Sequence, residues 1–263
     1  MDLIYPDATS FCDSFRLLES LNGAGARSTM ALEDEPFQEN VQELLRLLSA
    51  IKTNSAETHV ESSMRMLADT FDDEADIVVE ALERVEAHST VLCAIQQHFR
   101  NFKIQLHGCY VLLRLIELSS KIKSELQGKP DALRFILKVM SKYADKTCQV
   151  VGCKIISALC TSASTRRDVL SKGAVDSVLY AMSQFGEDEE FYIPAFEALT
   201  RLLADDLEVQ ENFMNIDVKN SRKKSYRMIV DIMEKHAKSG ELALVILSIS
   251  SFSFKGKQKG RLK

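Results

Sequence analysis

The sequence has no tryptophan, four prolines and ten glycines among its 263 residues. Glycine and proline supply most tight turns, so their scarcity argues against an all-β protein and against a collagen-like or low-complexity chain. No run of 18 uncharged apolar residues occurs, so we expect no membrane-spanning helix. The first six residues carry neither a basic cluster nor an apolar stretch, so we expect no secretory signal. With 46% hydrophobic residues, the chain can still bury a core.

Cysteine is present but without a pattern. The spacing of the six cysteines matches neither a structural zinc site nor a disulfide framework, and most lie inside apolar runs. They are predicted to be reduced core residues of a cytosolic or nuclear protein. The positions are Cys12, Cys93, Cys109, Cys148, Cys153 and Cys160.

Charge is unevenly distributed along the chain. Residues 1–100 contain 19 acidic and 7 basic side chains, residues 101–214 contain 15 and 14, and residues 215–263 contain 4 and 12. The chain therefore has an acidic beginning, a neutral middle and a basic end, within a total charge of −5. Such a gradient informs about partners and solubility, not about the fold.

Breaks in the apolar pattern divide the chain into three segments. Residues 1–38 are predicted to be an extension with one short amphipathic helix and an acidic linker over 22–38, because glycines and Pro36 interrupt the pattern. Residues 39–253 show apolar stripes of helical period almost without interruption. Residues 254–263 form a basic tail.

The helical segment repeats itself. The stretch GCYVLLRL from Gly108 is followed by GCKIISAL from Gly152, 44 residues later, and by AFEALTRL from Ala195, another 43 residues later. A period of 42–44 residues is too long for a tetratricopeptide unit and typical of HEAT or armadillo arrays. Glycine at Gly173, between two short helical stretches, predicts a sharp corner and hence three helices per repeat.

The chain here resembles the armadillo-repeat family. The resemblance rests on residues 166–185, with the corner Lys172-Gly173-Ala174, and on the following stretch 195–203. It implies an all-α, right-handed superhelix of about four to five repeats, some degenerate, in which neighbouring repeats share one continuous core.

In that family the third helix of each repeat lines a groove, where tryptophan and asparagine positions hold an extended peptide. The tryptophan-type positions here are Tyr110, Lys154 and Glu197, and the asparagine-type positions are Arg114, Ala158 and Arg201. Weaker alignments add Glu80 and Arg84 at the start, and Val245 and Ile249 at the end. Neither tryptophan nor asparagine stands at these positions, which argues against recognition of basic peptides as in nuclear import.

Arginine takes the asparagine-type position in three repeats. Its planar guanidinium suits carboxylates and phosphates, so Arg84, Arg114 and Arg201 are candidates for binding an acidic or phosphorylated segment. The alternative is that each arginine is an ordinary helix residue, paired with a glutamate at helical spacing such as Glu117 or Glu197.

The basic end supports a second hypothesis, binding of nucleic acid or anionic lipid. Few aromatic residues accompany the cations, and a polar cap on the last repeat or a nuclear-targeting signal would explain them equally well. The residues concerned are Lys219, Arg222, Lys223, Lys224, Lys255, Lys257, Lys259, Arg261 and Lys263.

No catalytic pattern is found. Phosphate-binding loops, dinucleotide turns, nucleophile elbows and zinc-protease motifs are missing, and no cofactor or metal is expected. His98 and His107 lie near Cys93 and Cys109, but His98 occupies a repeat position held elsewhere by Lys142, Gln184 and Lys235, and is predicted to face solvent.

The sequence therefore predicts a monomeric, non-catalytic scaffold or adaptor that binds a protein or peptide in the armadillo groove, in the cytoplasm or nucleus. Charge-driven binding through the basic end is the first alternative. The second is that the chain is the repeat region of a larger protein, such as a kinase or a ubiquitin-pathway component.

Overall fold

The computed structural model describes residues 35–53, 56–71, 75–186, 188–204, 206–218 and 224–235. Across these ranges the chain forms thirteen α-helices and no strand, apart from one isolated bridge between Asp217 and Lys224. The predicted all-α fold is confirmed. The chain divides into two compact bodies, Met1–Ser119 and Ser120–Lys263, here called the N-terminal and C-terminal bodies.

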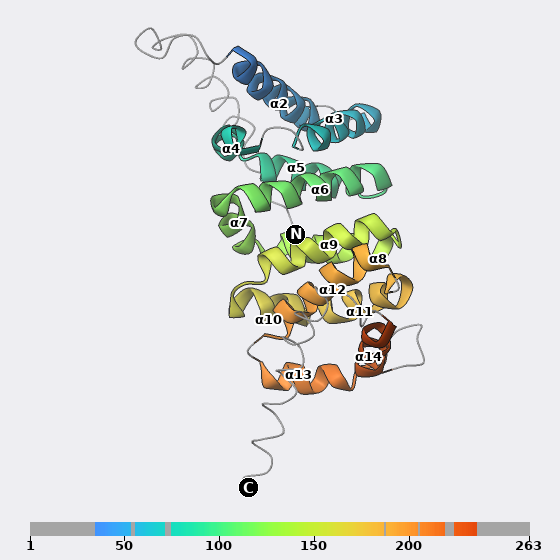
Figure 1. The fold of residues 1–263 in the computed structure, drawn as a ribbon. Helices are drawn as coiled ribbons and strands as arrows, with labels where there is room; N and C mark the ends of the chain where they lie inside the picture. Colours follow the sequence, from blue (N-terminus) through green and yellow to red (C-terminus); the bar gives the residue numbers. More distant parts are fainter. Residues whose placement is uncertain are drawn as a thin grey trace. The chain divides into compact units, whose positions relative to one another are not determined.

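The N-terminal body contains five described helices (Figure 1). Its most extensive contact joins α3 to α6, and α2 packs on α3 while α5 packs on α6. The helices are α2 (Glu35–Thr53), α3 (Glu57–Thr70), α4 (Ala75–Arg84), α5 (Ala87–Gln97) and α6 (Phe102–Leu118).

The C-terminal body contains eight described helices. Its most extensive contact joins α9 to α12, which lie side by side in Figure 1. The helices are α7 (Ser120–Gln127), α8 (Pro130–Lys142), α9 (Lys146–Leu159), α10 (Ala163–Ser171), α11 (Ala174–Phe185), α12 (Glu189–Leu202), α13 (Leu207–Met214) and α14 (Ser225–Lys235).

Each complete repeat has three helices, as the glycine corner predicted. The groups α4–α5–α6, α7–α8–α9 and α10–α11–α12 each place a first, second and third helix in the same order. Gly173 has a φ of 78° between α10 and α11, a left-handed conformation that favours glycine, and α11 starts directly after it. The boundary between the two bodies follows Ser119, just after the third helix α6, and so falls between repeats.

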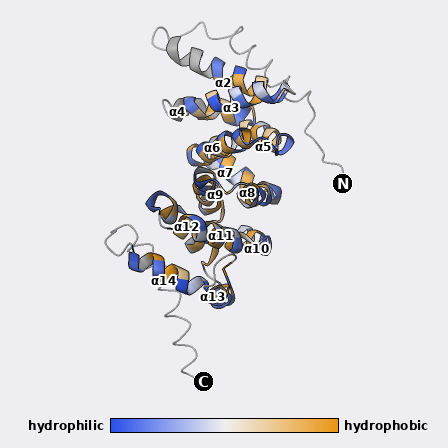
Figure 2. Cartoon of the chain, turned by 90° about the vertical axis from the view of Figure 1, so that its right-hand side faces the viewer, coloured by the Kyte–Doolittle hydropathy of each residue, from blue (hydrophilic) through white to orange (hydrophobic). Residues whose placement is uncertain are grey.

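The helices carry both hydrophobic and hydrophilic residues (Figure 2). In the third complete repeat, Phe191, Tyr192 and Phe196 are the largest of the fully buried side chains among the described residues. Cys109 and Cys153 are buried at equivalent positions of α6 and α9, so their predicted role in packing is confirmed. Burial raises the pKa of the Cys153 thiol.

A buried glutamine fixes the corner between the second and third helix in two repeats. Gln149 on α9 donates to the carbonyl oxygens of Met140 and Tyr143, both at 2.7 Å, at the end of α8. Gln105 on α6 donates in the same way to the carbonyls of Ile95 (2.7 Å) and His98 (3.1 Å) at the end of α5. These side chains satisfy terminal helix carbonyls that have no partner within their own helix.

Several predicted segments fall outside the described residues. The short helix near the N-terminus and the basic tail lie there, and α2 begins at Glu35, within the segment predicted as a linker. The segment bounds 1–38, 39–253 and 254–263 therefore stay predictions, as does the right-handed superhelix.

Candidate partner-binding surface

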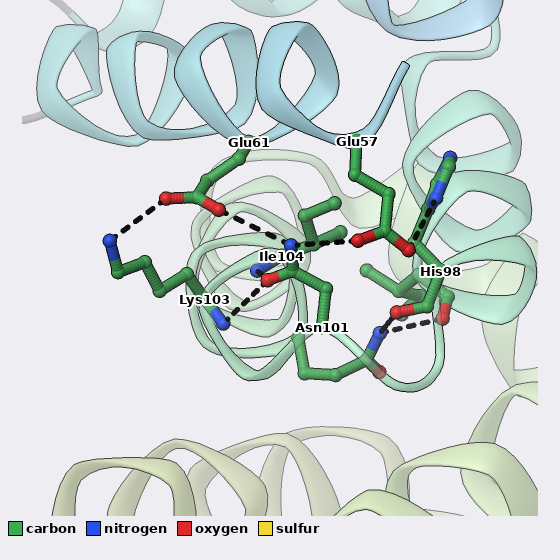
Figure 3. Close-up of polar contacts among 8 residues, drawn as sticks. Glu57, Glu61, His98, Asn101, Lys103 and Ile104 are labelled. Carbon is green, nitrogen blue, oxygen red and sulfur yellow. Dashed lines mark hydrogen bonds and ion pairs between the residues drawn. The ribbon is translucent and has the colours of Figure 1, made fainter. Parts of the chain in front are cut away.

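Helix α3 packs on α6 as α9 packs on α12, so α3 is the third helix of a repeat to which α2 also belongs. A polar cluster aligns the starts of the third helices α3 and α6 (Figure 3). The Asn101 side chain caps α6 by accepting from the backbone N–H groups of Lys103 and Ile104. Its amide also donates to the carboxylates of Glu57 (3.4 Å) and Glu61 (3.2 Å) on α3. Lys103 Nζ lies 3.0 Å from Glu61, and both contacts lower the pKa of the Glu61 carboxyl.

Arg114 joins the opposite ends of the same two helices. One guanidinium nitrogen lies 2.8 Å from Glu117 on α6, and another donates to the carbonyl of Phe71, the C-cap residue of α3, at 3.3 Å. The contacts at the two ends join residues 40 to 44 positions apart. Helices α3 and α6 therefore run parallel, in the register that the repeat period predicts.

The C-terminal body aligns α9 and α12 by a related contact. Lys146 at the start of α9 lies 2.9 Å from Asp188, which caps α12, and 2.7 Å from Glu190. Hydrogen bonds to these two carboxylates raise the pKa of the Lys146 ammonium group, and Lys146 in turn lowers the pKa of Asp188. The contacts span 42 and 44 residues, so the register again follows the repeat.

Between these ends, the third helices present different chemistry in the two bodies. In the N-terminal body, Met66 on α3 and Tyr110 on α6 occupy equivalent positions 44 residues apart; Met66 is 41% exposed and Tyr110 is half-buried. In the C-terminal body, the equivalent positions hold Lys154 on α9 and Glu197 on α12, both exposed. At this position the N-terminal body is thus apolar and aromatic, and the C-terminal body carries two opposite charges.

Most of the residues predicted to line the groove lie on third helices. Tyr110 and Arg114 belong to α6, Lys154 to α9, and Glu197 and Arg201 to α12.

Arg84 differs, because it is the last residue of α4, a first helix, and is not in line with the other arginines. On α3, the positions equivalent to Tyr110 and Arg114 are Met66 and Thr70. Sequence reasoning missed Met66 because the first repeat was aligned by its apolar stripe, which belongs to α4.

The structure predicts different roles for Arg114 and Arg201. Arg114→Ala should lower the free energy of unfolding by about 1–2 kcal/mol, because it leaves the Phe71 carbonyl and the Glu117 carboxylate without this partner. Arg201→Ala should change it by less than about 0.5 kcal/mol, because this side chain is exposed at the end of α12. Urea unfolding of both variants measures the difference; equal losses would contradict it.

Comparison with family models agrees with this arrangement. The model described as the LRRK2 ARM repeat matches residues 62–249, more than two thirds of the chain. The chain belongs to this family. The match begins within α3 and includes every complete three-helix repeat described above.

A solved structure shows the same fold as these ARM repeats. An engineered protein from the Northeast Structural Genomics Consortium superposes with a TM-score of 0.53 at 12% identity, over 81% of this chain. The ARM repeat chain spans about half (51%) of the length of that protein. No curated protein matches.

The prediction that His98 faces solvent is wrong. Its side chain is only 11% exposed, and Nδ1 lies 3.7 Å from a Glu57 carboxylate oxygen (Figure 3). His98 is the C-cap of α5, so the chain turns there and directs the ring toward the start of α3. Among the described residues of the ARM repeats, including His98, no group of three His, Cys, Asp or Glu side chains is placed to hold a metal.

Most of the predicted basic patch lies outside the described residues. Lys219, Arg222 and Lys223 fall there, as do all five cations from Lys255 to Lys263. Lys224 is described, and its ammonium group lies 2.7 Å from Asp217 and donates to the Asn215 carbonyl at 3.0 Å. It therefore joins residues that the structure describes on either side of positions 219–223. None of the described helices is both long and apolar enough to span a bilayer.

His107 gives the α3–α6 pair a dependence on pH. Burial lowers the pKa of His107 below its ordinary value of about 6.5, against the opposing effect of Asp69 and Glu61. His107 therefore binds a proton more readily in the unfolded chain than in the folded one. Its contribution to stability is fully present above the ordinary pKa of about 6.5 and is lost as the pH falls below that value. We expect His107→Gln to lose less stability than the native chain between about pH 7.5 and pH 5.5. Urea midpoints at the two pH values test this, and identical losses would exclude it.

Proposed function

We propose that the chain is a non-catalytic module that binds a partner protein along the outward faces of its third helices. The supporting observation is the exposure of Met66. In the part of the chain that the structure describes, Met66 and Tyr226 are the exposed large hydrophobic residues. Met66 lies on the third-helix face, in register with Tyr110. Methionine adapts to varied apolar partners, and tyrosine is enriched in interfaces.

The third-helix face of each body suits a different kind of partner side chain. Met66 and Tyr110 suit an apolar anchor side chain, whose burial supplies affinity. Lys154 and Glu197 suit a pair of opposite charges, which sets orientation and excludes wrong partners more than it adds affinity. Arg201, one turn beyond Glu197, is the arginine most available for a carboxylate or phosphate, since Arg114 already holds α3 and α6 together.

Membership of an ARM repeat family supports a protein partner, since stacked repeats expose extended surfaces suited to one. The proposal that the chain is not an enzyme rests on the absence of catalytic motifs from the sequence. We also propose a monomer in the cytoplasm or nucleus, and the alternative of a repeat region within a larger protein stands. No described residue favours nucleic-acid or lipid binding over a protein partner.

Affinity capture with matched variants tests the proposal. Met66→Glu should abolish capture of proteins retained by the native chain, and charge reversal at Lys154→Glu with Glu197→Lys should weaken it. Tyr226→Glu is the control, because Tyr226 is similarly exposed (44%) but lies on α14, away from the third helices α3 and α6. Circular dichroism establishes that each variant is folded. Retention of the same proteins by Met66→Glu would refute the proposal.

A further inference from the structure

Helix α3 carries two methionines in opposite environments. Met64 is fully buried (0% exposed) and faces α6, since its Cε lies 3.7 Å from the place of a Cβ atom on Gly108. Met66 comes two residues later and is 41% exposed. Two residues turn a helix by about 200°, which places the two side chains on opposite sides of α3. The two thioethers therefore share one helix and differ in their access to solvent.

The other methionines whose side chains the structure describes are buried. Met140 and Met182 are each 2% exposed and Met228 is 6% exposed, and all three lie in the C-terminal body. Among the described methionine side chains, Met66 is therefore the one that a dissolved oxidant reaches without local opening of the fold.

The cysteine thiols compete poorly for such an oxidant. A peroxide reacts with the thiolate, so the susceptibility of a cysteine follows its thiolate character and exposure. Cys148, Cys153 and Cys160 are at most 1% exposed, and burial raises the pKa of each thiol. Burial also raises the pKa of Cys93, which is half-buried, and Cys109 is 2% exposed. Among the described side chains, oxidation is thus directed to a thioether rather than to a thiol.

We propose that Met66 is a site of reversible oxidation that controls partner binding on the third-helix face of the N-terminal body. Hydrogen peroxide transfers one oxygen atom to the thioether: a sulfur lone pair forms the S–O bond, the O–O bond breaks, and water leaves. The sulfur loses two electrons and the peroxide gains them. A methionine sulfoxide reductase reverses the step, as two thiols supply two electrons, become a disulfide and release the oxygen as water.

Oxidation changes the chemistry at the position of the proposed apolar anchor. The sulfoxide is polar, and this change disrupts interfaces built on methionine. The effect on binding rests on the proposed function, whereas the selectivity of oxidation does not. The fold tolerates the sulfoxide at Met66, because its oxygen stays in water. At Met64 the same oxygen would lie buried between α3 and α6, where a polar group without a hydrogen bond is costly.

Peroxide treatment of the full chain tests the site. Trypsin cleaves after Arg65, so Met64 and Met66 fall in separate peptides whose sulfoxide content mass spectrometry measures over time. We expect Met66 to oxidise faster than Met64 by roughly tenfold or more in the native chain, and at a similar rate in urea. Methionine sulfoxide reductase with dithiothreitol should restore the mass of the Met66 peptide. Equal rates in the native chain would overturn the proposal.

Met66→Leu is the matched variant for the effect on binding. Leucine keeps an apolar side chain of similar size and has no sulfur to oxidise. After peroxide treatment and removal of the peroxide, we expect the native chain to lose capture of its partner proteins and to regain it after the reductase, while Met66→Leu keeps capture throughout.

The same variants separate failure of this control from failure of the proposed function. Capture retained by a native chain that carries the Met66 sulfoxide, or lost equally by oxidised Met66→Leu, would refute the control by oxidation. If Met66→Glu loses capture in either case, the binding face itself stands. If Met66→Glu retains capture without any oxidant, the proposed function fails, and the control that rests on it fails with it.

Discussion

Gln149→Met is expected to lower the free energy of unfolding of the C-terminal body by about 2–4 kcal/mol. The substitution keeps the length of the side chain but removes its N–H donors, which leaves the carbonyls of Met140 and Tyr143 without this partner. A buried acceptor that loses its hydrogen bond costs about 1–3 kcal/mol. Gln149 is buried, so water does not replace the lost amide without rearrangement.

Gln184→Met is the matched control. Gln184 lies on α11 of the same body, but it is exposed, and its amide donates to the hydroxyl of its neighbour Ser183 rather than to a helix carbonyl. We expect a change within about 0.5 kcal/mol. Urea unfolding followed by circular dichroism compares the two variants. Equal midpoints for Gln149→Met and the native chain would show that the corner hydrogen bonds contribute nothing net.

Gly108→Ala and Gly152→Ala are expected to differ by about 1–3 kcal/mol, although the two glycines occupy equivalent positions. A Cβ on Gly108 would overlap Cγ2 of Ile95, a β-branched side chain with one preferred rotamer. A Cβ on Gly152 would lie 2.6 Å from Cγ and Sδ of Met140, which can move aside.

Alanine also favours the helix over glycine by about 1 kcal/mol. This gain should offset most of the cost in Gly152→Ala, whereas Gly108→Ala stays destabilising. The third repeat already carries alanine, the buried Ala195, at the same position of α12. Thermal unfolding of both variants measures the difference, and a larger loss for Gly152→Ala would contradict the packing argument.

The repeat period and the three-helix corner could be predicted from sequence because they depend on local signals. Apolar residues recur at the same position in every third helix, and Gly173 has a conformation that other residues rarely adopt. The paired glutamines carried a signal too, since Gln105 and Gln149 each precede a glycine-cysteine pair by three residues. That repetition would have identified a shared role within the chain, although not its hydrogen-bond partners.

The candidate site was less predictable because it depends on which helix a residue belongs to. Arg84 and Arg114 follow similar apolar stripes, yet one ends a first helix and the other lies on a third helix. Met66 reads as a core residue by type, and its exposure follows only from the packing of α3 on α6. The contact of Arg114 with the Phe71 carbonyl joins residues 43 positions apart, so no local pattern shows it.

The corner and register contacts have a consequence for how the chain folds. Gln105 and Gln149 bind carbonyls within ten residues, and the longest contacts that align third helices span 44 residues. Chains dominated by such short sequence separations close only short loops, so they fold quickly and can begin at more than one place. A repeat leaving the ribosome therefore already contains the partners for its own corner, and it needs only the next 44 residues to complete its alignment.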